Sequence, residues 1–173
     1  MSTYTTRVLL VEDEEVARKT LSFYLNTIFD EVVVASDGQE GIDYFKEAHD
    51  EDKSFDLVLT DIKMPNKDGI EMIDEMLEII PEQRFIIVSA HKNEEDLLKL
   101  INLKVLGYFV KPLNVDNMMD MLQKANDELL ATKKETKEDD SPLVLNNTYT
   151  YNRTRSLLSH CNNRNTLVRF LRI

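Results

Sequence analysis

Residues 55–69 read FDLVLTDIKMPNKDG, and this stretch decides the fold. The run from Phe55 to Thr60 is short and mostly apolar, which predicts a strand buried on both faces of a sheet. Asp61 follows it directly, and Pro65 and Gly69 are typical of a turn before a new apolar pattern begins. The stretch therefore predicts a buried strand with an acid at its carboxyl end.

Four more runs of the same kind are RVLLV at 7–11, EVVVA at 31–35, RFIIVS at 84–89 and GYFV at 107–110. Between and after the five runs, apolar residues recur at helical spacing, as in Val16, Leu21 and Leu25; Ile42 and Phe45; Ile73 and Leu77; Leu97 and Ile101; and Met118 and Leu122. Five strands alternating with five helices predict an α/β fold with a parallel sheet and helices on both faces.

The length and the charge distribution suggest one domain with an appendage. A chain of 173 residues, 42% of them hydrophobic, buries one substantial core. Its net charge is −11, but residues 143–173 contain five Arg and no acid. The overall negative charge repels nucleic acid, so only this basic tail is a candidate for contact with it.

Nothing in the sequence points to export or to a membrane. The apolar run from Val8 to Val11 is far too short for a signal peptide or a membrane span. The single cysteine, Cys161, cannot form an internal disulfide, which suits a reducing compartment. We therefore expect a cytoplasmic protein with no membrane contact.

Charged and polar residues follow four of the predicted strands: Glu12 and Asp13, Asp61, Ser89, and Lys111. Working residues of such sheets gather beyond the carboxyl ends of the strands. Singly, each has an ordinary explanation; the acids after the first strand, for example, suit the N-terminus of a helix. Together they suit phosphoryl transfer to a carboxylate, with an oxygen-seeking cation, an ammonium and a hydroxyl neutralising the phosphoryl oxygens.

At this point the sequence resembles the receiver-domain family of response regulators. The motifs LLVEDEE, LVLTDIKMPNKDG, VSAH and GYFVKP occur in the order found in that family, and the similarity covers about residues 5–131. The resemblance implies a flavodoxin-like, doubly wound, five-stranded parallel sheet with strand order 2-1-3-4-5. It also implies a phosphorylation switch served by a sensor histidine kinase or a phosphotransfer protein.

The family's roles carry over residue by residue. Asp61 is implied to be the phosphoryl acceptor, and Mg²⁺ or Mn²⁺ is implied to be bound by Asp13, Asp61 and the backbone carbonyl of Lys63, with Glu12 acting through water. Lys111 would pair with the phosphate, Ser89 would donate a hydrogen bond to it, Tyr108 would rotate inward, and the peptide bond before Pro112 would be cis. No enzymatic activity is expected beyond Mg²⁺-dependent self-phosphorylation and autodephosphorylation.

Lys63 and His91 flank the expected path of a hydrolytic water. We hypothesise that they tune the lifetime of the phosphate. Ordinary solvent-facing side chains at both positions are an equal alternative.

Three segments are predicted: a receiver domain at 1–131, a charged linker or frayed helix end at 132–142, and a basic tail at 143–173. The start of the tail weakly resembles the opening strands of a winged-helix effector, but too few residues follow for a recognition helix. DNA binding is therefore expected only if a complete effector exists beyond this chain.

Three functions stay open: a signalling switch that acts on transcription through a truncated effector, a stand-alone receiver that acts by protein contacts, and a hydrolase. The hydrolase is disfavoured because Lys63 stands where a haloacid-dehalogenase-type enzyme has a second aspartate. In the receiver family the face made by the fourth helix, fifth strand and fifth helix is the usual output surface, so a homodimer through this face is a further expectation. The methionines Met118, Met119 and Met121 lie on that last helix, where core packing is the simpler interpretation.

Overall fold

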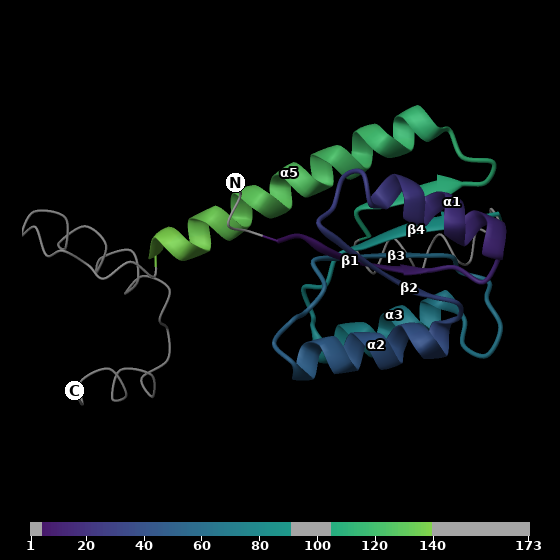
Figure 1. Cartoon of the computed structure of the whole chain (residues 1–173). Helices are drawn as coiled ribbons and strands as arrows, with labels where there is room; N and C mark the ends of the chain where they lie inside the picture. The colour runs from purple at the N-terminus through teal and green to yellow at the C-terminus, as the bar shows by residue number, and fades with distance from the viewer. Residues whose placement is uncertain (1–4, 91–104, 140–173) are drawn as a thin grey trace, which may run out of the picture. The chain divides into compact units, whose positions relative to one another are not determined.

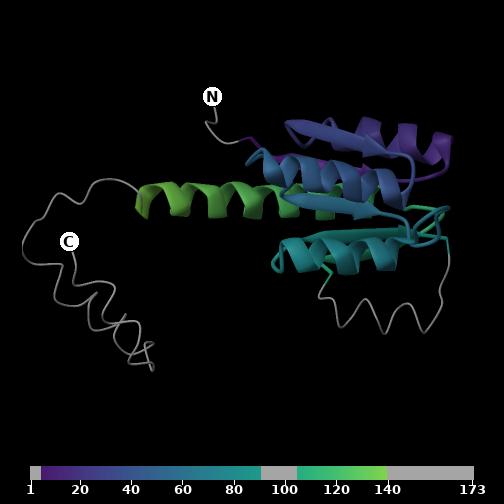
Figure 2. The ribbon, with the colours of Figure 1, turned by 90° about the horizontal axis from the view of Figure 1, so that it is seen from below.

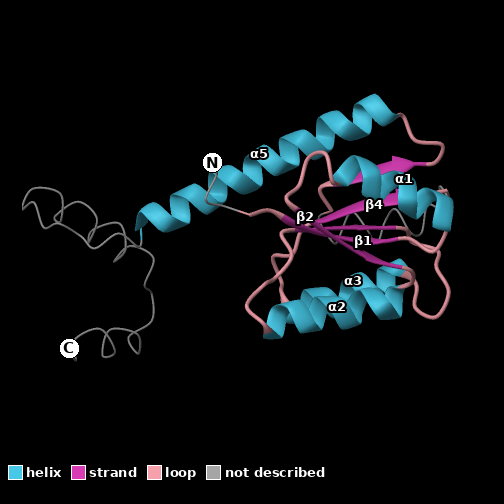
Figure 3. Ribbon diagram, viewed as in Figure 1, coloured by secondary structure: helices cyan, strands magenta, loops and turns pink. Residues whose placement is uncertain are grey.

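A five-stranded parallel sheet forms the centre of the protein (Figures 1 and 3). The structure is a computed structural model that describes residues 5–90 and 105–139. The strands are β1 (Arg7–Val11), β2 (Glu31–Ala35), β3 (Leu57–Thr60), β4 (Phe85–Ser89) and β5 (Gly107–Val110). Their order is β2-β1-β3-β4-β5. The predicted fold class and strand order are confirmed.

Helices cover both faces of the sheet. The described helices are α1 (Glu15–Leu25), α2 (Gly38–Asp50), α3 (Gly69–Ile79) and α5 (Val115–Asp139). Helices α1 and α5 lie on one face, and α2 and α3 lie side by side on the other (Figures 1 and 2). The helix predicted around Leu97–Ile101 lies outside the described residues.

Two separate hydrophobic clusters fill the spaces between the sheet and its helices. One contains Phe45 of α2 and Ile73 of α3, packed with Leu9, Val58 and Ile87 of the sheet. The other joins α1 and α5 to the opposite face of the same strands and includes, among others, Leu21, Leu25, Met118 and Leu122, which lie against Val8, Leu10, Leu57, Leu59, Ile86 and Val88. Because successive side chains of a strand point to opposite faces, each central strand contributes to both clusters.

Burial differs between the central and the edge strands. Every residue of β3 and β4 is buried, whereas β2 and β5 are mostly half-buried. The prediction that all five strands are buried on both faces was therefore wrong for the edges, since an edge strand has a neighbour on one side only. Val16 likewise belongs to no core, because it is 71% exposed on α1.

Aspartates begin the two helices that follow β2 and β3. The side chain of Asp37 accepts hydrogen bonds from the backbone N–H groups of Gln39 and Glu40, and Asp68 accepts from those of Ile70 and Glu71. Such N-caps satisfy donors that a helix leaves unpaired at its start, typically for about 1 kcal/mol. They fix where the loops after β2 and β3 end.

Helix α5 continues through residues 132–139, part of the segment predicted as a linker or frayed helix end. Within this continuation, the Lys133 Nζ lies 2.7 Å from a carboxylate oxygen of Asp56 and 2.6 Å from the carbonyl oxygen of Thr5. The chain divides into two units at Thr136. Residues 143–173, and with them the predicted basic tail, lie outside the described range.

Among the helices of the described ranges, none has the length and apolar character needed to cross a lipid bilayer.

Candidate functional site

The polar residues predicted at the strand ends are brought to one edge of the sheet. Val11 of β1 is in register with Thr60 of β3, and the backbone N–H of Asp61 donates to the carbonyl oxygen of Val11 at 3.1 Å. Glu12 and Asp61 therefore leave their strands at the same level. Lys111 leaves β5 beside the end of β4, where its backbone N–H donates to the carbonyl oxygen of Ser89 at 2.9 Å.

The Lys111 ammonium binds two of these acids at once. Its Nζ lies 2.8 Å from both carboxylate oxygens of Glu12 and 2.8 Å from Oδ2 of Asp61. The side chain of Glu12 is 1% exposed and that of Asp61 is 8% exposed. A charge-assisted bond in such a buried setting is stronger than one in water.

Burial and the Lys111 contacts act in opposite directions on the pKa values of the pair. Burial raises the pKa of the Glu12 carboxyl, and the hydrogen bond from Lys111 only partly opposes this. For Lys111, burial acts to lower the pKa, but hydrogen bonds to Asp61 and Glu12 outweigh it and the pKa is raised. Lys111 is therefore a cation at neutral pH, held by acids that its single charge does not fully neutralise.

A third carboxylate completes an oxygen-rich group. Carboxylate oxygens of Glu12, Asp13 and Asp61, one from each, lie within 4.8 Å of one another. Hard divalent cations such as Mg²⁺ prefer this kind of ligand, and three carboxylates against one ammonium leave negative charge for such a cation to neutralise. The donor set fits Mg²⁺.

Backbone donors fix the orientation of the Asp61 carboxylate. Its Oδ1 accepts from the N–H of Ile62 at 2.5 Å and from the N–H of Lys63 at 3.3 Å. The loop is closely packed behind it, because a Cβ added at Gly69 would lie 2.1 Å from the carbonyl oxygen of Asp61. Oδ1 is thus held by the chain itself, while Oδ2 faces Lys111.

The other predicted residues occupy the adjoining strands. Ser89 is fully buried at the end of β4, and Tyr108 is half-buried on β5 in register with Ile87. The peptide bond between Lys111 and Pro112 is cis, as the resemblance implies. The Lys63 side chain is half-exposed, with Nζ 3.6 Å from a carboxylate oxygen of Asp68. His91 lies outside the described residues.

Sequence reasoning missed Arg18. One guanidinium nitrogen of this residue, Nη1, donates to the carbonyl oxygens of Glu12 and Asp13, both at 2.9 Å. The signal available in the sequence was a cation near the start of a helix, the positive end of the helix dipole, where acids are favoured. Because a cation is disfavoured at this end of a helix, its presence indicates a specific hydrogen-bond partner.

The sequence and the fold match those of receiver domains. A sequence model of the family described as "Response regulator receiver domain" matches residues 8–123. The chain is 34% identical over 116 residues to the chemotaxis protein CheY of Halobacterium salinarum, a match covering 67% of this chain and 92% of CheY. It is 31% identical over 120 residues to the probable C4-dicarboxylate response regulator DctR of Bacillus subtilis, covering 68% of this chain and 51% of DctR.

Solved structures agree. The N-terminal domain of an uncharacterised protein from Wolinella succinogenes superposes with a TM-score of 0.67 at 31% identity, covering 73% of this chain and 98% of that one. A CheY-like receiver domain protein from Methanospirillum hungatei gives a TM-score of 0.65 at 25% identity, covering 76% and 99%. The match spans about half the length of DctR. Because the family model matches residues 8–123 and the acidic edge lies within them, the chain belongs to the receiver-domain family of two-component response regulators.

Proposed function

We propose that this chain is a signalling switch in which Asp61 accepts a phosphoryl group from a phosphohistidine of a sensor histidine kinase or phosphotransfer protein, or from a small phosphodonor. The observation that carries the proposal is the contact of Lys111 Nζ with Asp61 Oδ2 and both oxygens of Glu12, each at 2.8 Å. It supports the proposal because an ammonium and an excess of carboxylate oxygen surround Asp61, the proposed nucleophile.

In the proposed reaction a carboxylate oxygen of Asp61 attacks phosphorus while the bond from phosphorus to the donor breaks. With phosphohistidine the broken bond is P–N, and its electron pair returns to the imidazole. The product is an acyl phosphate on Asp61. The N–H groups of Ile62 and Lys63 keep the carboxylate oriented, so attack requires no rearrangement of the side chain.

Lys111 serves as the ammonium that neutralises the phosphoryl oxygens. Its present partners on Asp61 and Glu12 lie at the place where a new anion forms, so a small movement exchanges carboxylate for phosphoryl contacts. Such positioned charge supplies most of the catalysis in phosphoryl transfer, where the protein does little covalent chemistry beyond the nucleophile.

Mg²⁺ or Mn²⁺ would be held by Asp13, Asp61 and the Lys63 carbonyl, with Glu12 reached through water. When bound it would neutralise the carboxylates and the phosphoryl oxygens. The three-carboxylate group within 4.8 Å supports this assignment. The 1% exposure of Glu12, and its double contact with Lys111, suit a role through water better than direct binding.

Ser89 and Tyr108 would pass the change to the surface. Ser89 is buried at the end of β4, and its carbonyl already accepts from the backbone of Lys111. A hydrogen bond from its hydroxyl to the phosphoryl group would draw the end of β4 toward Asp61, and Tyr108, on the neighbouring strand, would move into the space released. Phosphorylation then shifts a two-state equilibrium toward the active surface.

Transcription is the proposed output. DctR of Bacillus subtilis is named as a response regulator and ZraR of Escherichia coli as a transcriptional regulatory protein, and the match covers 51% and 26% of their lengths. A stand-alone receiver is the alternative, since the match covers 92% of the chemotaxis protein CheY. DNA contact needs an effector beyond this chain. The proposed homodimer would use the face of the fourth helix, β5 and α5, of which the fourth helix lies outside the described residues.

The lifetime hypothesis stands for Lys63 and His91. The ion pair of Lys63 with Asp68 places its side chain over the loop that follows Asp61. Replacing Lys63 by Asn and His91 by Glu, and timing phosphate loss, tests it. An unchanged rate of loss removes the hypothesis.

The decisive experiment is Mg²⁺-dependent labelling with radiolabelled acetyl phosphate, followed by mapping of the modified residue. We expect one hydroxylamine-sensitive phosphate, on Asp61, that is not formed in EDTA. Label on another residue, or label that does not need a divalent cation, would overturn the proposal.

A further inference from the structure

We infer that Arg18 is a positioning residue for divalent cation binding, acting through the backbone of Glu12 and Asp13 rather than by touching cation or phosphate. The inference rests on the proposed function of the acidic edge. It concerns a residue outside the acidic group, on the first turns of α1.

Arg18 contacts the loop between β1 and α1 through both its backbone N–H and its side chain. Its backbone N–H donates to the carbonyl oxygen of Glu14 at 2.8 Å, a hydrogen bond of the first turn of α1. Its Nη1 returns over the same loop to the carbonyl oxygens of Glu12 and Asp13, both at 2.9 Å. One residue thus fixes the loop relative to the helix through backbone and side chain together.

The two acids differ in how much they need this support. Glu12 is buried and is further held by Lys111 and by its own backbone N–H, which donates to the carbonyl oxygen of Ala35 at 3.2 Å. Asp13 is exposed. Packing therefore does little to fix the backbone of Asp13, whereas the Arg18 guanidinium holds its carbonyl oxygen through a hydrogen bond.

Charge and position predict opposite effects of removing Arg18, which makes the inference testable. A guanidinium near three carboxylates competes electrostatically with a divalent cation, so its loss alone would tighten binding. Loss of the two hydrogen bonds would free the loop and weaken binding, as removal of groups that orient metal ligands generally does. The structure points to the second effect, because Arg18 contacts carbonyl oxygens and no described carboxylate.

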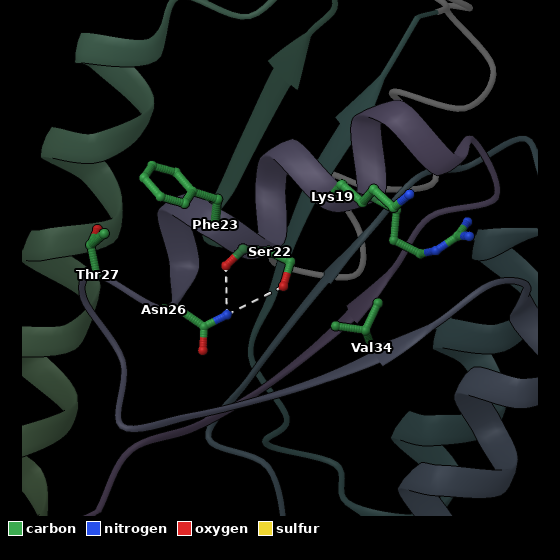
Figure 4. A pocket seen from close by; sticks show the side chains of 7 residues that line it. Lys19, Ser22, Phe23, Asn26, Thr27 and Val34 are labelled. Atoms are coloured by element: carbon green, nitrogen blue, oxygen red, sulfur yellow. Dashed lines mark hydrogen bonds between the residues drawn. The ribbon is translucent and has the colours of Figure 1, made fainter.

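Lys19 provides a matched control on the same helix. Arg18 and Lys19 both line a hollow of about 560 Å³ along α1 and β2, together with Ser22, Phe23, Asn26, Thr27 and Val34 (Figure 4). The Lys19 ammonium pairs with Glu15 at 2.5 Å, on the exposed side of α1. Lys19→Met therefore removes a positive charge of the same helix without releasing the loop.

The test is calorimetric titration of unphosphorylated, full-length protein with Mg²⁺, at a temperature where each variant is folded. We expect Arg18→Met to raise the Kd for Mg²⁺ about tenfold, Arg18→Lys to recover part of the loss, and Lys19→Met to leave Kd within about twofold of wild type. Folding stability alone does not move the Kd of a fully folded protein. The phosphorylation rate of Arg18→Met with acetyl phosphate should recover when Mg²⁺ is raised.

The outcomes separate this inference from the proposed function. Mg²⁺ binding by the wild type that is lost in Asp13→Asn supports the proposed site, and Arg18→Met then decides the inference. Unchanged or tighter binding in Arg18→Met overturns the positioning role alone. A wild type that binds no Mg²⁺ overturns the proposed site and the inference with it.

Discussion

The Nζ of Lys111 lies 2.8 Å from each carboxylate oxygen of Glu12, a side chain that is 1% exposed, and yet the pKa of Glu12 is raised above its ordinary value of 4.5. Burial thus outweighs the favourable contact. A further positive charge at the acidic edge would stabilise the ionised carboxylates. Without it, ionisation of the buried Glu12 destabilises the folded protein.

This cost predicts a pH dependence. The folded protein binds the Glu12 proton more tightly than the unfolded chain does, so the Glu12 contribution to stability is present below the ordinary value of 4.5 and is lost as pH rises through the raised value. The raised pKa of Lys111 acts only near and above 10.5, outside this window. In EDTA, the melting temperature of wild type minus that of Glu12→Gln should fall as pH rises from about 4.5 to neutrality. A difference that grows with pH contradicts the assignment.

Mg²⁺ should stabilise the folded protein by relieving the same repulsion. A cation that binds only the folded state at a hundred times its Kd adds about 2.7 kcal/mol to the free energy of unfolding. Urea unfolding with Mg²⁺, compared with NaCl at equal ionic strength, measures this gain. Asp13→Asn should lose most of it. An equal gain in NaCl would assign the effect to screening rather than to the site.

Lys111→Met should destabilise the protein in the absence of Mg²⁺. The change leaves the buried carboxylates of Glu12 and Asp61 without their ammonium, and breaking a buried ion pair costs about 3–5 kcal/mol. The 19% exposure of the Lys111 side chain favours the lower end. Urea unfolding in EDTA measures the loss, and Mg²⁺ should restore part of it. Lys124→Met, on the exposed side of α5, is the control and should change stability little.

Asp61→Asn should abolish phosphate incorporation from acetyl phosphate. The amide cannot attack phosphorus as a carboxylate does, while its size keeps the loop packed. Intact-mass measurement before and after hydroxylamine treatment detects the phosphate. The matched control is Asp43→Asn, an exposed acid of α2 bonded to the Gln39 side chain, which should be phosphorylated as wild type is. Hydroxylamine-sensitive phosphate retained in Asp61→Asn would show that the acceptor is a different residue.

The sequence predicted most of the fold and of the acidic edge because both depend on local patterns. Short apolar runs mark the strands. Acids after Val11 and Thr60, the hydroxyl after Val88 and the amine after Val110 come together once the strands are parallel. Composition alone does not separate edge strands from central strands, since the apolar runs are alike and pairing distinguishes them; the predicted strand order came from the family resemblance.

Contacts between residues distant in sequence were beyond this reasoning. Lys133 pairs with Asp56 across 77 positions. The composition of residues 132–142 left a linker and a frayed helix end open, and it could not show that this contact lies within a helix that continues to Asp139. The role of Arg18 was missed for a related reason. Its partners are carbonyl oxygens, and every residue has one, so the sequence marks the cation near the helix start but not its partners.

Gly69→Ala should damage the acceptor loop directly. An added Cβ would lie 2.1 Å from the carbonyl oxygen of Asp61 and 3.0 Å from Cα of Ile62, both backbone atoms, so the loop that orients the Asp61 carboxylate has to move. Overpacking of this kind costs about 1–3 kcal/mol, and the phosphorylation rate should fall together with stability. Gly107→Ala is the matched control, because its Cβ would meet the flexible end of Met121 instead of backbone. Urea unfolding and labelling with acetyl phosphate measure both effects in both variants. If Gly69→Ala were phosphorylated at the wild-type rate, the packing behind Asp61 would not be what orients its carboxylate, and the two backbone N–H donors alone would have to account for it.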